Sequence, residues 1–232
     1  RYFDRITDAR QILTALPRAI QVMTDPVTCG PVCLALPQDV QTQAFDCPEH
    51  FLHPDVIRFR RPPADAGELA RAVTLLSRAK QPLIVAGGGV LYSQAWQTLR
   101  AFAERHGIPV TETQAGKSSL PWDHPLNVGA IGVTGSPAAN ALAREADVVL
   151  AVGTRLQDFT TGSHSLLAQA QIVGLNVNPM DAYKWQSKPL VADAQVGLMQ
   201  LSAALGDWAA DANWTARAKD LASQWDARVT AL

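Results

Sequence analysis

Three consecutive glycines, Gly87–Gly89, follow the apolar run Leu83–Ala86 and have the residue types of a phosphate site. A glycine turn after a strand lets backbone amides and a helix N-terminus approach a pyrophosphate. The dinucleotide fingerprint is incomplete, because Tyr92 stands where its third glycine would be, although Glu112 could imitate the acid that binds a ribose. The spacing therefore leaves a nucleotide site open without requiring one.

Two cations, Lys117 and Arg155, come shortly after predicted strands. The carboxyl ends of parallel strands share one edge of a sheet, and ligands bind at that edge. The two side chains are therefore candidates for binding an anion. The alternative is that they are solvated, as most cations in surface loops are.

The other residues with catalytic potential are isolated. His124, in a loop, has the side chain of a general base near neutral pH, but no nucleophile stands beside it. Asp158, Ser163 and His164 are hydrolase residue types within one loop, whereas triads are assembled from separate segments. No metal-ligand pattern follows Asp207. We therefore expect no catalytic centre and no metal site within this chain.

Composition excludes several classes of protein. The chain has 232 residues, of which 47% are hydrophobic and 18% charged, with a formal net charge of −1. That balance argues against a nucleic-acid partner and predicts a soluble globular protein. No run is long and apolar enough for a membrane span, and residues 1–10 lack the apolar core of a signal peptide. The odd cysteines Cys29, Cys33 and Cys47 lack C-x-x-C spacing, which favours free thiols in the cytoplasm.

The elements that must position these residues alternate between strand and helix, which predicts a doubly wound parallel α/β sheet with helices on both faces. The run 83–86 is apolar throughout, as expected for a strand covered on both sides. Further strands are predicted at 108–111, 147–152, 172–177 and 190–192. Helix starts are predicted from cap residues at Asp65 (a capping box with Glu68), Ser93, Ser136 and Asp193.

The two ends of the chain indicate a fragment. We expect one helix, 13–23, and one strand, 32–36, in the first forty residues, and these cannot make a core without partner strands from upstream. A proline-rich linker follows. The final helix carries an apolar stripe that includes Trp214 and Trp225; this stripe either docks on the sheet or connects to another domain.

A set of residues through the middle of the chain resembles a known family. These residues are Gly116, Lys117, Pro121, Asp123, His124, Pro125, Gly129, Gly132, Gly135, Ala139, Asn140, Asp147, Gly153, Arg155, Asp158 and Thr161. On them the chain is similar to the central domain of thiamine-diphosphate-dependent enzymes. The domain order of that family is pyrimidine-binding, central and diphosphate-binding.

The resemblance implies a division of the chain into four parts. Residues 1–40 would be the tail of the pyrimidine-binding domain, 41–64 a linker, 65–206 the Rossmann-like central domain, and 207–232 a helix connecting toward the diphosphate-binding domain. Both neighbouring domains would lie outside this chain. Because the activating glutamate and the metal-binding motif of the family belong to those domains, the fragment would be a scaffold without catalytic activity.

Within the family, the chain looks most like a hydrolase of inositol catabolism that opens a cyclic diketone by breaking a carbon–carbon bond. The resemblance implies thiamine diphosphate and Mg²⁺ in the full-length enzyme, which would be a cytoplasmic homo-oligomer. Some relatives, such as acetohydroxyacid synthase, carry FAD in the central domain. By position, Gly88, Lys117, Gly153 and Arg155 would lie nearest such a nucleotide or the substrate.

Three interpretations stay open at this point. The chain is a piece of a thiamine enzyme, a free-standing nucleotide-binding module, or a purely structural or oligomerising domain. Titration with nucleotides distinguishes the second from the others, and the complete reading frame distinguishes the first from the third.

Overall fold

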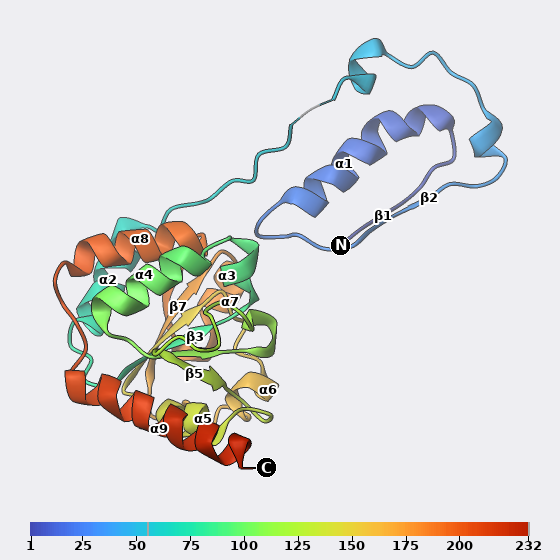
Figure 1. The fold of residues 1–232 in the computed structure, drawn as a ribbon. Coiled ribbons are helices and arrows are strands. Elements are labelled where there is room, and N and C mark those ends of the chain that lie inside the picture. The colour runs from blue at the N-terminus through green and yellow to red at the C-terminus, as the bar shows by residue number, and fades with distance from the viewer. Residues whose placement is uncertain (55, 232) are drawn as a thin grey trace. The chain divides into compact units, whose positions relative to one another are not determined.

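The computed structural model describes residues 1–54 and 56–231. Its contacts divide the chain into two compact units, Arg1–Arg61 and Pro62–Leu232. The first unit is small, and the second contains the large sheet (Figure 1). Each unit is described by itself. The four-part division expected from the sequence stays a prediction.

The first unit pairs two parallel strands, β1 (Tyr2–Arg5) and β2 (Val32–Ala35), with helix α1 (Ile12–Thr24). A small core of Ile6, Ala15 and Val40 lies between them. The expectation of one helix and one strand was wrong, because β1 is a second strand. Its partner lies thirty residues away, and a four-residue segment carries too little pattern to reveal such a pairing. The remaining elements are the short 3-10 helices Ala9–Gln11, Val40–Thr42 and Glu49–Leu52.

The second unit is built on a six-stranded, all-parallel sheet. Its strands are β3 (Pro82–Ala86), β4 (Val110–Glu112), β5 (Asn127–Ala130), β6 (Val148–Val152), β7 (Gln171–Asn176) and β8 (Lys188–Val191). The spatial order β5-β4-β3-β6-β7-β8 is the 3-2-1-4-5-6 order of a Rossmann sheet. The predicted doubly wound fold is confirmed. The sequence prediction missed β5 because its glycine-spaced residues resemble a loop.

Helices cover both faces of this sheet (Figure 1). One core joins Ile84 and Ala86 of β3 to α2 (Ala66–Leu76), α4 (Trp96–His106) and α8 (Ala194–Leu205). The other core joins Leu83 and Val85 to α5 (Pro137–Glu145) and α9 (Ala212–Thr230). Alternate residues of one strand thus enter opposite cores, which is why the run contains no polar residue.

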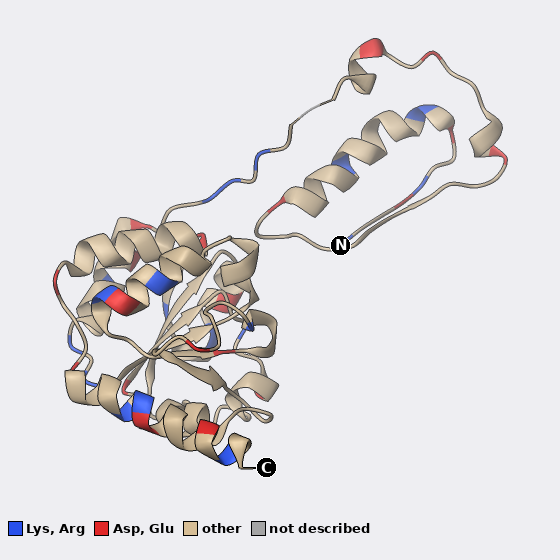
Figure 2. Cartoon of the chain, in the orientation of Figure 1, with Lys and Arg blue, Asp and Glu red and all other residues tan. Residues whose placement is uncertain are grey.

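Helix α9 docks on the sheet through the first half of its apolar stripe. Trp214 is buried, and its indole N–H donates to the carbonyl of Pro82 at 2.8 Å. Charged residues of both signs occur along α9 (Figure 2), and they are exposed. Whether α9 also leads to another domain stays a prediction.

The predicted helix caps are mostly confirmed. Asp65, Ser136 and Asp193 each accept hydrogen bonds from backbone amides of the first turn that follows. The other half of the predicted capping box, a hydrogen bond from the Asp65 amide to the Glu68 carboxylate, was wrong. The buried Glu68 carboxylate accepts the amide of Val191 at 2.8 Å instead. A helix-to-strand bond thus replaces a local one.

Ser93 is not the N-cap of α4. It ends the short helix α3 (Gly88–Tyr92), and its hydroxyl donates to the Asp193 carboxylate at 2.8 Å. The triple glycine is therefore the turn from β3 into helix α3. Trp96, at the start of α4, is 42% exposed. At Ser93 a contact distant in sequence overrides the local pattern.

Within residues 1–54 and 56–231, no helix has the length and apolar character needed to cross a lipid bilayer.

Candidate functional site at the carboxyl edge of the sheet

The chain leaves β3 and β6 toward opposite faces of the sheet, so the crevice between their carboxyl ends is the switch point where doubly wound folds bind ligands. Two glycine turns meet there. The amide of Gly87 donates to Val152 O at 2.8 Å, and the amide of Gly89 donates to Gly153 O at 2.9 Å. Two of the amides that would cradle a phosphate are therefore already engaged within the protein.

The two turns are in backbone contact. A Cβ built on Gly153 would lie 2.5 Å from the Cα of Gly89, and Gly153 also has a left-handed backbone, with φ of +59°. Gly88 faces the other way, and a Cβ on it would lie 3.2 Å from Ala115 O. Gly88 and Gly153 thus allow close packing of the protein against itself. A role for either in binding a ligand stays a prediction.

Lys117 lines a cavity on the β4 side of the switch point. It follows the 3-10 helix η4 (Gln114–Gly116), is exposed, and has no hydrogen-bond or ion-pair partner among the described residues. The cavity has a volume of about 720 Å³, and two tryptophans, Trp96 and Trp122, contribute to its wall. Trp122 is 88% exposed.

Glu112 places a buried carboxylate in the same cavity. It is the last residue of β4 and is 7% exposed. Its Oε1 accepts the amide of Leu120 at 2.9 Å, which fixes the loop that carries Lys117. The cavity therefore combines aromatic walls, a carboxylate and a cation, the mixture typical of small-molecule sites. The fingerprint spacing pointed to Glu112, whereas no sequence signal pointed to the two tryptophans.

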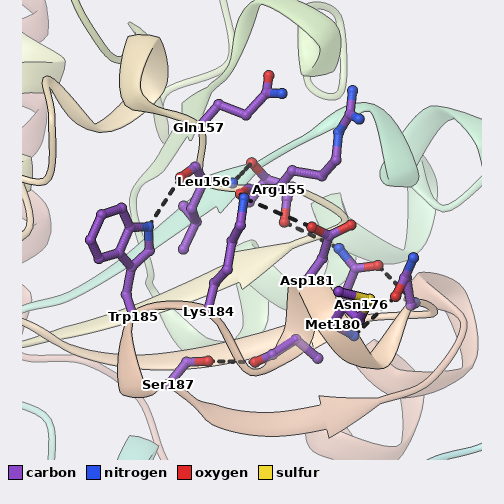
Figure 3. Close-up of polar contacts among 12 residues, drawn as sticks. Arg155, Leu156, Gln157, Asn176, Met180, Asp181, Lys184, Trp185 and Ser187 are labelled. Atoms are coloured by element: carbon purple, nitrogen blue, oxygen red, sulfur yellow. Dashed lines mark hydrogen bonds and ion pairs between the residues drawn. The ribbon is translucent and has the colours of Figure 1, made fainter.

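Arg155 lies in the loop after β6, and side chains from a later segment of the chain donate hydrogen bonds to the backbone of this loop (Figure 3). The carbonyls of Thr154–Leu156 accept hydrogen bonds in succession from Asn176 Nδ2 at 3.1 Å, Lys184 Nζ at 2.7 Å and Trp185 Nε1 at 3.1 Å. Lys184 is further oriented by the Asp181 carboxylate at 3.9 Å. Three donors from one neighbouring segment thus fix three consecutive peptide groups.

The Arg155 guanidinium itself is uncommitted. It points away from Asp181 and Lys184 (Figure 3) and has no hydrogen-bond or ion-pair partner within the part of the chain that the structure describes. A guanidinium on a rigid loop can bind a carboxylate or phosphate through two parallel hydrogen bonds. The geometry is therefore that of an anion ligand at the carboxyl edge, although the role itself stays a prediction.

The backbone around Arg155 is strained. Among the described residues, seven non-glycine residues have a positive φ, and five of them lie in this region: Leu156, Ser163, His164, Trp185 and Gln186. Each such residue costs roughly 1–2 kcal/mol relative to a right-handed conformation. The His164 and Trp185 rings stack 4.3 Å apart at 6°, which joins the two strained segments. Strain of this kind concentrates at functional sites, where surrounding contacts enforce it.

The isolated candidates do not assemble into a catalytic group. No hydrogen bond joins the side chains of Asp158, Ser163 and His164 among the described residues, and His164 Nδ1 is buried without a partner. His124 is buried; its Nε2 lies 3.0 Å from Glu104 Oε1, and its Nδ1 accepts a backbone amide. It therefore attaches a loop to α4 as a structural residue.

The four predicted site residues share one edge but not one pocket. Because β4 and β6 flank β3 in the sheet, Lys117 and Arg155 lie on either side of the glycine turns. The cavity that contains Lys117 is not lined by Arg155 or Gly153. The structure thus separates a β4-side cavity from a β6-side cationic loop.

Comparison with known proteins agrees with this architecture. Residues 69–201 match the family model described as thiamine pyrophosphate enzyme, central domain. The chain is similar to proteins named 3D-(3,5/4)-trihydroxycyclohexane-1,2-dione hydrolase. Identity is 45% over 207 residues for the Clostridium perfringens protein (88% of this chain, 32% of the relative). It is 45% over 208 residues for Geobacillus thermodenitrificans (90% and 33%) and 39% over 234 residues for Clostridium tetani (100% and 36%). The chain spans about a third of the length of these relatives.

Proposed function

Because this chain belongs to the thiamine pyrophosphate enzyme family, as a central domain, we propose that it is the scaffold of a hydrolase that opens 3D-(3,5/4)-trihydroxycyclohexane-1,2-dione. The ring would open at a carbon–carbon bond to give 5-deoxyglucuronate, a step of myo-inositol catabolism. The observation that carries the proposal is the 39% identity with the Clostridium tetani hydrolase across the whole of this chain, both units included. An acetohydroxyacid-synthase-like, FAD-binding role is not favoured, since the quoted relatives share the hydrolase name.

We infer that thiamine diphosphate and Mg²⁺ are held outside this chain. Among the described residues, no group of three or more His, Cys, Asp or Glu side chains is placed to hold a metal ion. Asp207, which follows Gly206, is fully exposed, and its Oδ1 lies 3.6 Å from Arg105 Nη2. The proposal therefore assigns both groups to the rest of the full-length enzyme, and no reaction step is assigned to this chain.

The first unit supports a division of the full-length protein into domains. A two-stranded parallel sheet is too small to be stable alone, and parallel strands are normally covered on both faces. In β1–β2, Phe3 and Cys33 are exposed on one face. We therefore assign residues 1–40 to a larger pyrimidine-binding domain, 41–64 to a linker, 65–206 to the central domain and 207–232 to a helix leading to the diphosphate-binding domain.

The decisive experiment uses the protein expressed from its complete reading frame, with thiamine diphosphate and Mg²⁺ added. Conversion of the cyclic dione to 5-deoxyglucuronate is expected, and the 232-residue chain alone should be inactive under the same conditions. Formation of acetohydroxyacids from pyruvate, with FAD retained on the purified protein, would support the alternative and refute the hydrolase proposal.

In the full-length enzyme we propose that Lys117 and Arg155, beside the glycine turns at Gly88 and Gly153, lie nearest the substrate and donate hydrogen bonds to its ketone and hydroxyl oxygens. Arg155→Met should raise KM for the dione with a smaller change in kcat, because the loop backbone stays held by its three donors. Arg144→Met, in α5 on the outer surface, is the matched control. An unchanged KM for the Arg155 variant would remove it from the site.

We also place the full-length protein in the cytoplasm as a homo-oligomer. Support for a reducing compartment comes from Cys29, Cys33 and Cys47, which are all free thiols. Light scattering coupled to size exclusion measures the oligomeric state, and a monomeric full-length enzyme would refute that part.

A further inference from the structure

A second cavity lies at the opposite, amino-terminal edge of the sheet. It has a volume of about 510 Å³ and is bounded by α2 and by the beginnings of β6, β7 and β8. The five residues of β6 span about 13 Å from this edge to the turn at Gly153. The cavity is therefore separate from the carboxyl-edge site and is not part of the function proposed above.

Three cations converge on this cavity. Arg71 lies on α2, and Arg78 lies two residues beyond the end of that helix. Seven residues correspond to about two helical turns, or a rise of about 10 Å along a helix axis. Lys188 is the first residue of β8, which packs against α2 and is joined to it by the Glu68–Val191 hydrogen bond. The cations thus come from two elements whose relative position is fixed.

The single acid in the described part of the wall forms no ion pair with these cations. Asp147 is the one carboxylate lining the cavity, and its two oxygens accept the amides of Lys80 at 2.7 Å and Gln81 at 2.9 Å. None of the three cations forms an ion pair or hydrogen bond with another described residue. The described wall thus carries three positive charges and one negative charge, and the three cations are exposed and available to a bound anion.

We propose that this cavity binds a small molecule carrying at least two phosphate or carboxylate groups. Guanidinium groups match both oxyanions through paired hydrogen bonds, and two arginines that line one cavity can each bind one such group of the same molecule. The exposed amide of Gln171 adds a neutral donor. The volume lies within the range of small-molecule pockets, whereas an acidic protein segment would need a longer open groove.

Isothermal titration of the 232-residue chain with inorganic pyrophosphate, in physiological salt, tests the proposal. Saturable binding with one site per chain is expected. In a triple variant with Arg71→Gln, Arg78→Gln and Lys188→Gln, the affinity should fall at least about tenfold. A parallel titration with citrate tests for carboxylate binding, as pyrophosphate tests for phosphate binding. The probe that binds more tightly identifies which of the two groups the cavity prefers.

The matched control removes the same charge elsewhere. Arg144→Gln, Lys219→Gln and Arg228→Gln, on α5 and α9, lower the net charge equally and should leave the affinity unchanged. Without anion, the first triple variant should melt close to the temperature of the parent chain, because the three replaced side chains are exposed and form no ion pair with another described residue. Absence of saturable binding at millimolar pyrophosphate, or equal loss of affinity in both triple variants, would overturn the proposal.

Discussion

Gly153→Ala tests whether the turns after β3 and β6 really meet. Gly153 has φ of +59°, and the added Cβ would lie 2.5 Å from Gly89 Cα. A left-handed backbone at a residue with a Cβ costs roughly 1–2 kcal/mol. Forcing an extra carbon into close packing costs about 1–3 kcal/mol more, because neither backbone can move without disturbing its strand. The free energy of unfolding should therefore fall by about 2–5 kcal/mol.

Denaturant unfolding and thermal melting measure this loss, with about 2–4 °C expected for each kcal/mol. Gly107→Ala is the matched control. Gly107 has nearly the same φ, +63°, but a Cβ on it would meet nothing closer than Thr215 Oγ1 at 3.5 Å. It should lose only the conformational cost of roughly 1–2 kcal/mol. Equal losses in the two variants would refute the backbone contact between the turns.

Three further perturbations have outcomes set by named contacts. Burial lowers the pKa of His106, so on acidification the unfolded chain takes up a proton before the folded chain does. The free energy of unfolding should therefore be highest above about pH 6.5 and should fall as the pH drops below that value. His106→Gln should make the free energy of unfolding less dependent on pH in this range. Trp185→Ala removes the His164 stack and the bond to Leu156 O, and should speed hydrogen exchange in the loop after β6. Asp147→Ala leaves two backbone amides without their acceptor and should cost about 1–3 kcal/mol in denaturant unfolding.

Each of these variants has a control of the same residue type. His53→Gln and Asp226→Ala replace exposed side chains, and Trp225→Ala replaces a half-buried one on the second half of α9. The pH prediction fails if His106→Gln keeps the parent slope. The Trp185 prediction fails if hydrogen exchange in the loop after β6 keeps the parent rate in Trp185→Ala. The Asp147 prediction fails if Asp147→Ala and Asp226→Ala lose the same free energy of unfolding.

The sequence predicted the elements that depend on neighbouring residues. Asp65, Ser136 and Asp193 cap their helices through amides two or three residues away, so the relevant contact is contained in the local pattern. The all-apolar run of β3 likewise predicted a strand buried on both faces. Gly107 ends α4 in the left-handed conformation that glycine favours.

Elements that depend on distant partners were missed. Ser93 has the chemistry of an N-cap, but its hydroxyl bonds to Asp193, one hundred residues away. The same holds for the site: Lys117 and Arg155 were predicted from their places after strands, but the donors that hold the Arg155 loop lie 22 to 29 residues downstream. No periodicity or motif marks Lys184 or Trp185, because only the folded sheet brings them to that loop.

The glycine turns also decide between a scaffold and a nucleotide site. A pyrophosphate at the switch point needs free amides where the helix after the first strand begins, yet Gly87 and Gly89 donate theirs to Val152 and Gly153 at 2.8 and 2.9 Å. Binding there would break two hydrogen bonds and separate two backbones in contact. We therefore expect equilibrium titration of the 232-residue chain with FAD and with NAD to show no binding at micromolar concentration. Micromolar affinity that Gly153→Ala abolishes would place a nucleotide between the turns and refute the reasoning.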